Sequence, residues 1–182
     1  DHIGAAWCAA FLHTMLKEKI DKALFLVTTD LAQKTADGKM ETVWGWPSLF
    51  VNPIAFWGVA YPKPPFHVMD MISRLRGRRI AVDASERAPG IFCTIDNDRN
   101  SVTALLWNYN GAILESSGGV DRSIAMALTL EIKGLPAAFA GKRLAVKRWQ
   151  ISEGGGNAMT LIAKGIPLTA ENTMLPLVEK VP

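Results

Sequence analysis

The sequence predicts an α/β segment over residues 1–78, followed by an all-β segment over residues 79–182. In the first part, a helical pattern alternates with a continuous apolar run. In the second part, short apolar stretches follow one another with turn residues between them. Hydrophobic residues make up 49% of the chain and charged residues 20%, which is typical of a protein that folds around a core. We therefore expect two domains that pack against each other without a flexible linker.

The α/β segment opens with an expected helix over residues 3–17, where Ile3, Trp7 and Phe11 recur at helical spacing. The uninterrupted apolar run ALFLVTT at 23–29 is typical of a strand that is covered on both faces. Residues 30–60 predict an aromatic-rich irregular loop with a turn at Asp37 and Gly38.

Three prolines precede the next expected helix, which covers residues 66–76. Proline fixes an extended approach, and Pro65 suits a first helical turn because that turn has unpaired amides in any case. Gly77 is expected to end the helix. The apolar residues of this helix share one face: Val68, Met71, Ile72 and Leu75.

Short strands separated by turns dominate the second segment, and this pattern favours an antiparallel sandwich or barrel. We expect a short helix at 169–180, with Thr169 as its N-cap and Pro176 interrupting it. Residues 154–156, which are all glycine, predict a hairpin turn. The expected strands are 91–96, 102–110, 122–132, 142–151 and 157–163.

Charge and cysteine content exclude several classes of function. The chain has a net charge of +3, and its basic clusters at 74–79 and 142–148 belong to no nucleic-acid-binding motif, so we expect solvated helix ends and no nucleic-acid partner. Cys8 and Cys93 are expected to be free buried thiols. We expect no metal, no cofactor and no membrane span, since neither zinc-ligand spacing nor a sufficiently long apolar run occurs. A start without Met or leader favours a fragment, a processed chain or a domain.

Several motifs together resemble the C-terminal third of glycoside hydrolase family 39. DHIGAAWCAAFLHTML at 1–16 looks like the seventh barrel helix of that family, and ALFLVTTD at 23–30 looks like its eighth strand. YPKPPFHVMDMISRLRGRRIA at 61–81 is similar to the Lys-Pro-led final helix. VTALLWNYN at 102–110 resembles the first robust sandwich strand, and GLP at 134–136 with residues 144–177 resembles the closing segment.

The resemblance implies the C-terminal portion of a (β/α)8 barrel over residues 1–78 and an accessory β-sandwich over residues 79–182. It implies retaining hydrolysis of a glycoside or polysaccharide by two glutamates, with an extracellular or periplasmic location. The family positions of both glutamates would precede Asp1, and Glu18 and Glu41 fit neither of them. We therefore assign no catalytic residue, and we expect a carbohydrate substrate and an N-terminal barrel portion as partners.

The expected substrate-binding residues are Thr29, Asp30, Trp44 and Trp46, at and after the end of the eighth strand. Asp30 would bind a sugar hydroxyl, orient a neighbouring residue or cap backbone amides. Trp44 and Trp46 would either stack on sugar rings or pack against the barrel top. We expect structural roles for the three histidines, His2, His13 and His67.

Two other functions stay open: a non-catalytic carbohydrate-binding or structural module, and a split enzyme with its first strands on another chain. If the chain is the C-terminal part of a barrel enzyme or one part of a split enzyme, we expect it to be inactive in isolation. We also expect it to aggregate or oligomerise through its apolar strand and helix.

Overall fold

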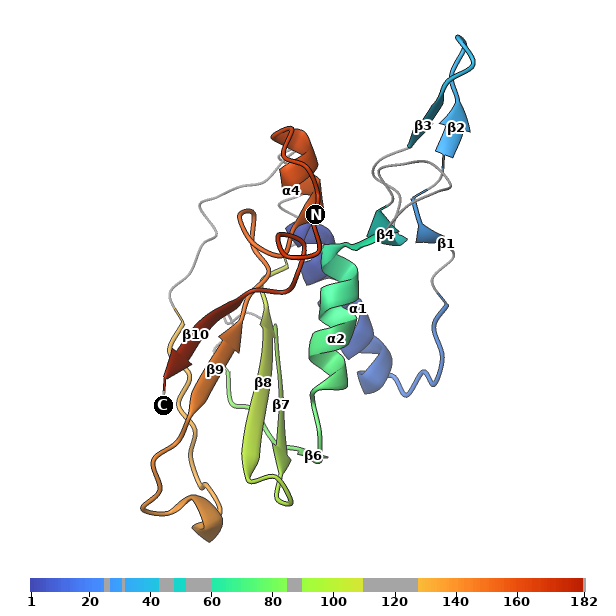
Figure 1. The fold of residues 1–182 in the computed structure, drawn as a ribbon. Coiled ribbons are helices and arrows are strands. Elements are labelled where there is room, and N and C mark those ends of the chain that lie inside the picture. The colour runs from blue at the N-terminus through green and yellow to red at the C-terminus, as the bar shows by residue number, and fades with distance from the viewer. Residues whose placement is uncertain are drawn as a thin grey trace.

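The computed structural model describes residues 1–24, 27–30, 32–42, 48–51, 60–84, 90–109 and 128–181. Figure 1 shows two helices side by side, with antiparallel strands on one side of them and a hairpin projecting from one end. In chain order the elements are α1 (His2–Lys17), β1 (Val27–Thr29), β2 (Ala32–Lys34), β3 (Met40–Thr42), β4 (Ser48–Val51), β5 (Tyr61–Pro62), α2 (Pro64–Ser73), β6 (Arg78–Arg79), β7 (Gly90–Asp96), β8 (Ser101–Trp107), η2 (Ala137–Phe139), β9 (Val146–Trp149), α4 (Ala158–Ala163) and β10 (Leu177–Val181).

The first expected helix is confirmed as α1. The carboxylate of Asp1 caps it by accepting a hydrogen bond from the Gly4 amide at 2.8 Å. Small side chains let α1 pack closely on α2, and the buried core between them consists of Ala5, Cys8, Ala9 and Val68. The free-thiol prediction is also confirmed, since Cys8 and Cys93 are buried and unbridged. Burial raises the pKa of the Cys8 thiol to about 11, which makes it unreactive.

The second expected helix is confirmed as α2, although its bounds differ from the prediction. It begins at Pro64, because two prolines fit the first turn, where amides need no helical partner. It ends at Ser73 rather than at residue 76. The Arg74 amide donates a hydrogen bond to the Met71 carbonyl at 3.1 Å, and the Leu75 amide donates one to the Ile72 carbonyl at 3.0 Å. The last turn therefore tightens before the chain leaves the helix.

A three-stranded sheet in the order β1-β4-β5 lies at the start of α2. β1 pairs in parallel with β4, with Val27 opposite Ser48 and Thr29 opposite Phe50. The strand expected at 23–29 is therefore shorter than predicted: residues 21–24 carry no strand, and residues 25–26 lie outside the described part. The following strand, β5, is antiparallel to β4.

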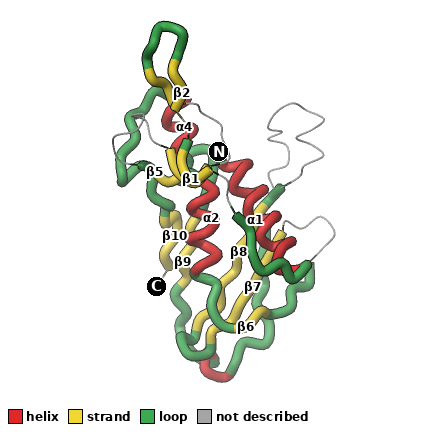
Figure 2. The backbone as a smooth tube through the Cα atoms, turned by 90° about the vertical axis from the view of Figure 1, so that its right-hand side faces the viewer, coloured by secondary structure: helices red, strands yellow, loops and turns green. Residues whose placement is uncertain are grey.

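The described parts of residues 30–60 are more regular than the sequence predicted. β2 and β3 form a hairpin that projects from the body in Figures 1 and 2, and β4 follows it. The expected turn is confirmed, since Gly38 adopts a φ of +84° and the Thr35 hydroxyl donates to the Lys39 carbonyl at 2.9 Å. The sequence did not predict this hairpin, because its three-residue strands are too short to show an alternation in hydropathy.

The second segment contains two antiparallel sheets in its described part. β7 and β8, which the sequence predicted as short apolar runs, pair along their whole length, from Gly90 opposite Trp107 to Asp96 opposite Ser101. β6 joins this sheet at the other edge of β7. β9 pairs with β10 in a separate two-stranded sheet. The strand expected at 122–132 falls largely outside the described residues, and residues 128–132 carry no strand. The sandwich itself stays a prediction.

The strand expected at 157–163 is wrong, because this segment forms the helix α4. Its sequence AMTLIA contains good helix formers, and a short apolar run cannot separate a helix from a strand by periodicity. The glycines at 154–156 consequently link β9 to a helix and form no hairpin turn. They bring the chain back to the helical layer, since a Cβ on Gly156 would lie 3.6 Å from the His67 ring.

The helix expected at 169–180 is also wrong. Thr169 and Asn172 exchange two hydrogen bonds, of 2.8 and 3.1 Å, and so form a reciprocal cap. This cap holds only the single turn at 170–173. Pro176 prevents the helix from continuing, and the chain then becomes the strand β10.

Candidate functional site

Three polar side chains meet where the parallel strands β1 and β4 approach the start of α2. Asp30 follows β1 directly, Ser48 opens β4, and Lys63 is the N-cap residue of α2. The Lys63 ammonium lies 2.7 Å from Asp30 Oδ1 and 2.9 Å from Ser48 Oγ. The Ser48 hydroxyl donates to the same Asp30 oxygen at 2.6 Å. We call these three residues the Asp30 cluster.

The Asp30 cluster is sealed from solvent. The side chains of Lys63 and Asp30 are 4% and 0% exposed, and Ser48 is fully buried. Two buried charges of opposite sign offset each other's desolvation only when they are also well hydrogen-bonded. Asp30 Oδ1 accepts two bonds, whereas its buried Oδ2 has no hydrogen-bond partner among the described residues. One oxygen of this carboxylate is therefore left for a donor beyond the cluster.

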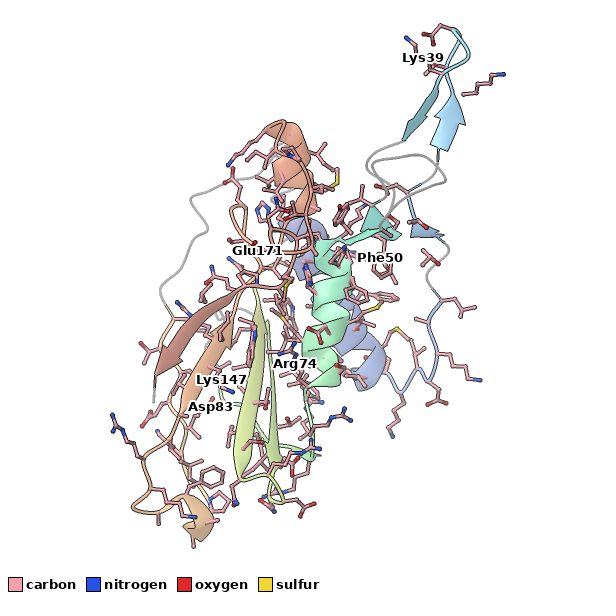
Figure 3. All side chains as sticks on the ribbon, in the orientation of Figure 1. Lys39, Phe50, Arg74, Asp83, Lys147 and Glu171 are labelled. Carbon is pink, nitrogen blue, oxygen red and sulfur yellow. The ribbon has the colours of Figure 1, made fainter. Side chains whose placement is uncertain are left out.

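Backbone bonds hold the cluster in place. The Asp30 amide donates to the Phe50 carbonyl at 3.1 Å, and the Lys63 amide donates to the Leu49 carbonyl at 2.8 Å. The Phe50 ring packs on Phe66 with a centroid distance of 4.7 Å, beside the start of α2 in Figure 3. The cluster thereby ties the end of β1, the strand β4 and the first turn of α2 into one unit.

The C-terminal segment closes over the neighbouring part of α2. His67 Nε2 lies 2.8 Å from the Thr173 carbonyl, and both residues are buried. On α1, His2 Nδ1 lies 3.4 Å from the side-chain nitrogen Nδ2 of Asn157, the residue that precedes α4. Segments far apart in sequence therefore meet around the starts of both long helices.

The residue types of the cluster raise the question of nucleophilic catalysis, because serine–lysine pairs occur in hydrolases. The geometry argues against this role, since Ser48 is fully buried and both Ser48 and Lys63 are engaged by Asp30. The cluster also holds a single carboxylate, whereas two-carboxylate glycoside hydrolysis needs a pair about 5 Å apart. The cluster therefore positions the backbone at the rim of the sheet and performs no bond cleavage by itself.

The structure brings together only part of the predicted site. Thr29 is half-buried at the end of β1, next to Asp30, so these two residues are adjacent as expected. Asp30 is not a backbone cap, because its side chain pairs with Lys63 and Ser48. Trp44 and Trp46 lie outside the described residues. Sequence reasoning missed Lys63 and Ser48, although a lysine set between Pro62 and Pro64 was a signal for a fixed, partly buried amine.

A second feature is an open hollow of about 500 Å³ between α1 and the β6–β7 region. The guanidinium of Arg79 lies 5.1 Å from the centre of the Phe92 ring and 3.4 Å from His13 Nε2. Burial, and then the charges of Arg79 and Lys17, lower the pKa of His13. The lining residues are His13, Arg79, Ile80, Ala81, Val82, Ala84 and Ile91.

No family model, curated protein or solved structure matches the chain. In the described ranges, no helix has both the length and the apolar character that a membrane crossing requires. The same ranges contain no group of three or more His, Cys, Asp or Glu side chains placed to hold a metal ion.

Stability should fall on acidification because of His67. Burial lowers the pKa of His67 from its usual 6.5, so the folded state holds the neutral ring while the unfolded state takes up a proton below about pH 6.5. The free energy of unfolding should therefore decrease as the pH falls from about 6.5 to the lower folded-state pKa, and then level off with respect to this group. Urea unfolding at about pH 7.5 and about pH 5 measures the difference.

The variant His67→Gln isolates this contribution, since a glutamine amide can still donate to the Thr173 carbonyl but does not titrate. Its unfolding free energy should change less with pH than that of the wild type. His13→Gln serves as the comparison, because its ring also has a lowered pKa but is only half-buried. An unchanged pH dependence in His67→Gln would show that another group is responsible.

Proposed function

We propose that this chain is the C-terminal part of a glycoside hydrolase whose catalytic carboxylates lie outside these 182 residues. On this proposal, residues 1–78 supply the last strand–helix unit of a (β/α)8 barrel and part of the substrate rim. Residues 79–182 supply an accessory β-domain. The resemblance of the ordered motifs to glycoside hydrolase family 39 supports it, and so do the parallel pairing of β1 with β4 and the packing of α1 against α2.

The position of Asp30 is the observation that carries the proposal. Active sites of α/β barrels lie at the carboxyl ends of the parallel strands, and Asp30 directly follows β1 at this end. Its Oδ2 atom is buried and has no hydrogen-bond partner in the part of the chain that the structure describes. A polar group from a neighbouring barrel segment, or a sugar hydroxyl reached through it, would complete this carboxylate.

The second candidate is a non-catalytic carbohydrate-binding or structural module. The burial of the Asp30 cluster favours the module, because the buried side chains of Ser48 and Lys63 are inaccessible to substrate. Antiparallel sheets such as β6-β7-β8 and β9-β10 are common in modules of this kind.

Hydrolysis assays distinguish the two candidates. The full-length gene product and the 182-residue chain would be tested in parallel on a panel of nitrophenyl glycosides, with nuclear magnetic resonance to follow the anomeric configuration. We expect turnover with net retention by the full-length product and none by the chain alone. Turnover by the pure chain would contradict our placement of the carboxylates. Binding of a polysaccharide by the full-length product without any turnover would favour the module.

A further inference from the structure

We propose that the open hollow between α1 and the β6–β7 region is a binding site for a small organic carboxylate that carries an apolar body. The carboxylate would lie between the Arg79 guanidinium and the His13 ring, and the apolar body would lie against the aliphatic walls. The hollow shares no residue with the Asp30 cluster, so the inference does not depend on the proposed hydrolysis of glycosides.

The size and lining of the hollow are those of a small-molecule site. Its volume is about 500 Å³, and ligand pockets in proteins typically enclose about 300–1,000 Å³. The aliphatic part of its lining consists of Ile80, Ala81, Val82, Ala84 and Ile91. Val82 is 39% exposed, so a ligand seated here would remove apolar surface from water. Apolar walls with a few polar groups that fix orientation define this class of site, and here the polar groups are His13 and Arg79.

Arg79 retains hydrogen-bond donors for such a ligand. Its guanidinium lies 5.1 Å from the centre of the Phe92 ring and 3.4 Å from His13 Nε2, so two neighbours fix its position. A guanidinium has several N–H donors and no acceptor. None of the ion pairs among the described residues involves Arg79. Its planar fork of donors fits a carboxylate with two parallel hydrogen bonds, so a carboxylate is the complement that the described residues do not supply.

His13 supplies the second contact. Arg79 can only donate, so the neutral His13 ring accepts at Nε2 and carries its proton on Nδ1. The cations of Arg79 and Lys17 act on this ring, and the neighbours that β7 and β8 place beside it are the uncharged rings of Phe92 and Trp107. A bound carboxylate would offset the repulsion from the two cations and raise the pKa of His13. The ring would then take up a proton as the ligand binds, so binding should strengthen as the pH falls through the range in which His13 titrates.

The combination of charge and apolar walls selects this class of ligand. An inorganic anion would pair with Arg79 but leave the aliphatic walls in water. A neutral hydrocarbon would cover the walls but leave the guanidinium shielded from water without an acceptor, which is unfavourable. Because the pKa of His13 is lowered, the ring is neutral at neutral pH. The single negative charge of a carboxylate then balances the permanent charge of Arg79.

Isothermal titration calorimetry with sodium hexanoate tests the site in the full-length gene product. We expect saturable binding that is several-fold tighter at about pH 6 than at about pH 7.5, a range in which histidine titrates and a carboxylate stays ionised. Titrations in two buffers that differ in ionisation enthalpy should show that the protein takes up a proton on binding.

Three variants assign the contacts. Arg79→Gln should weaken hexanoate binding by about tenfold or more, because the charge-assisted hydrogen bonds to the carboxylate are lost. Arg78→Gln is the matched control, since it removes the same charge from the neighbouring exposed position of β6 but does not line the hollow. It should leave the affinity unchanged. His13→Gln should keep measurable binding but lose both the pH dependence and the proton uptake.

The proposal is overturned if hexanoate shows no saturable binding, if its affinity is the same at both pH values, or if Arg79→Gln and Arg78→Gln lose equal affinity. Equal losses would mean a diffuse attraction between charges. Inorganic phosphate that binds as tightly as hexanoate would show that the walls contribute nothing, and 1-hexanol that does so would show the same for Arg79; either result also overturns it. The hydrolysis assay is a separate readout, and its failure would remove the proposed activity without affecting this site.

Discussion

Replacing Lys63 by methionine is expected to lower the free energy of unfolding by about 3–5 kcal/mol, because it leaves a buried carboxylate without its cation. The Asp30 side chain is 0% exposed, and Lys63 supplies one of the two hydrogen bonds to Asp30 Oδ1. Methionine keeps the length and apolar character of the lysine stem, so the loss reports on the charge rather than on packing. Urea unfolding followed by circular dichroism measures it.

Two further variants make the result specific to the buried pair. The double variant Asp30→Asn with Lys63→Met should recover much of the loss, because no uncompensated charge remains buried. Lys39 and Asp37 provide the matched control: they form the same kind of ion pair at 3.0 Å, but with side chains 78% and 56% exposed, near the tip of the hairpin in Figure 3. Lys39→Met should leave stability unchanged. Equal effects of Lys39→Met and Lys63→Met would contradict a special role for the cluster.

Replacing Gly77 by alanine is expected to have the second largest effect. Gly77 adopts a φ of +79°, which costs an L-residue about 1–2 kcal/mol. A Cβ at this position would also lie 2.0 Å from the Ile95 carbonyl oxygen and 2.8 Å from the Asp96 Cα, so the backbone of β7 would have to move. Overpacking of this kind typically adds about 1–3 kcal/mol, giving a loss of about 2–5 kcal/mol in all.

Gly141→Ala separates the two costs. Gly141 has a similar φ of +66°, but nothing lies within 4 Å of a Cβ built there. It should therefore show only the conformational cost, about 1–2 kcal/mol. The difference between the two variants measures how closely the chain after α2 approaches β7. Equal losses would mean that this approach is looser than the structure shows.

Local patterns predicted much of the fold. The spacing of apolar residues predicted α1, and the prolines before Phe66 predicted the entrance to α2 to within two residues of its observed start at Pro64. Short apolar runs separated by turn residues predicted the strands β7 and β8. These elements are governed by interactions within a few residues of sequence, which is why one sequence is enough to find them.

Long-range contacts decided the elements that the sequence mispredicted. α4 was expected to be a strand, because six apolar and small residues fit either conformation until their packing partners are known. Residues 177–180 were expected to be helical, yet Pro176 and the pairing with β9 place them in the strand β10. The hairpin of β2 and β3 likewise has no strong local pattern.

The sequence by itself predicted the two long helices, the strands β7 and β8 and the free thiols. Only the tertiary structure showed that Lys63 and Ser48 bury the Asp30 carboxylate, since these residues lie 33 and 18 positions away in sequence. Periodicity reports which side of an element is apolar, but a buried charge pair depends on what other segments bring to it.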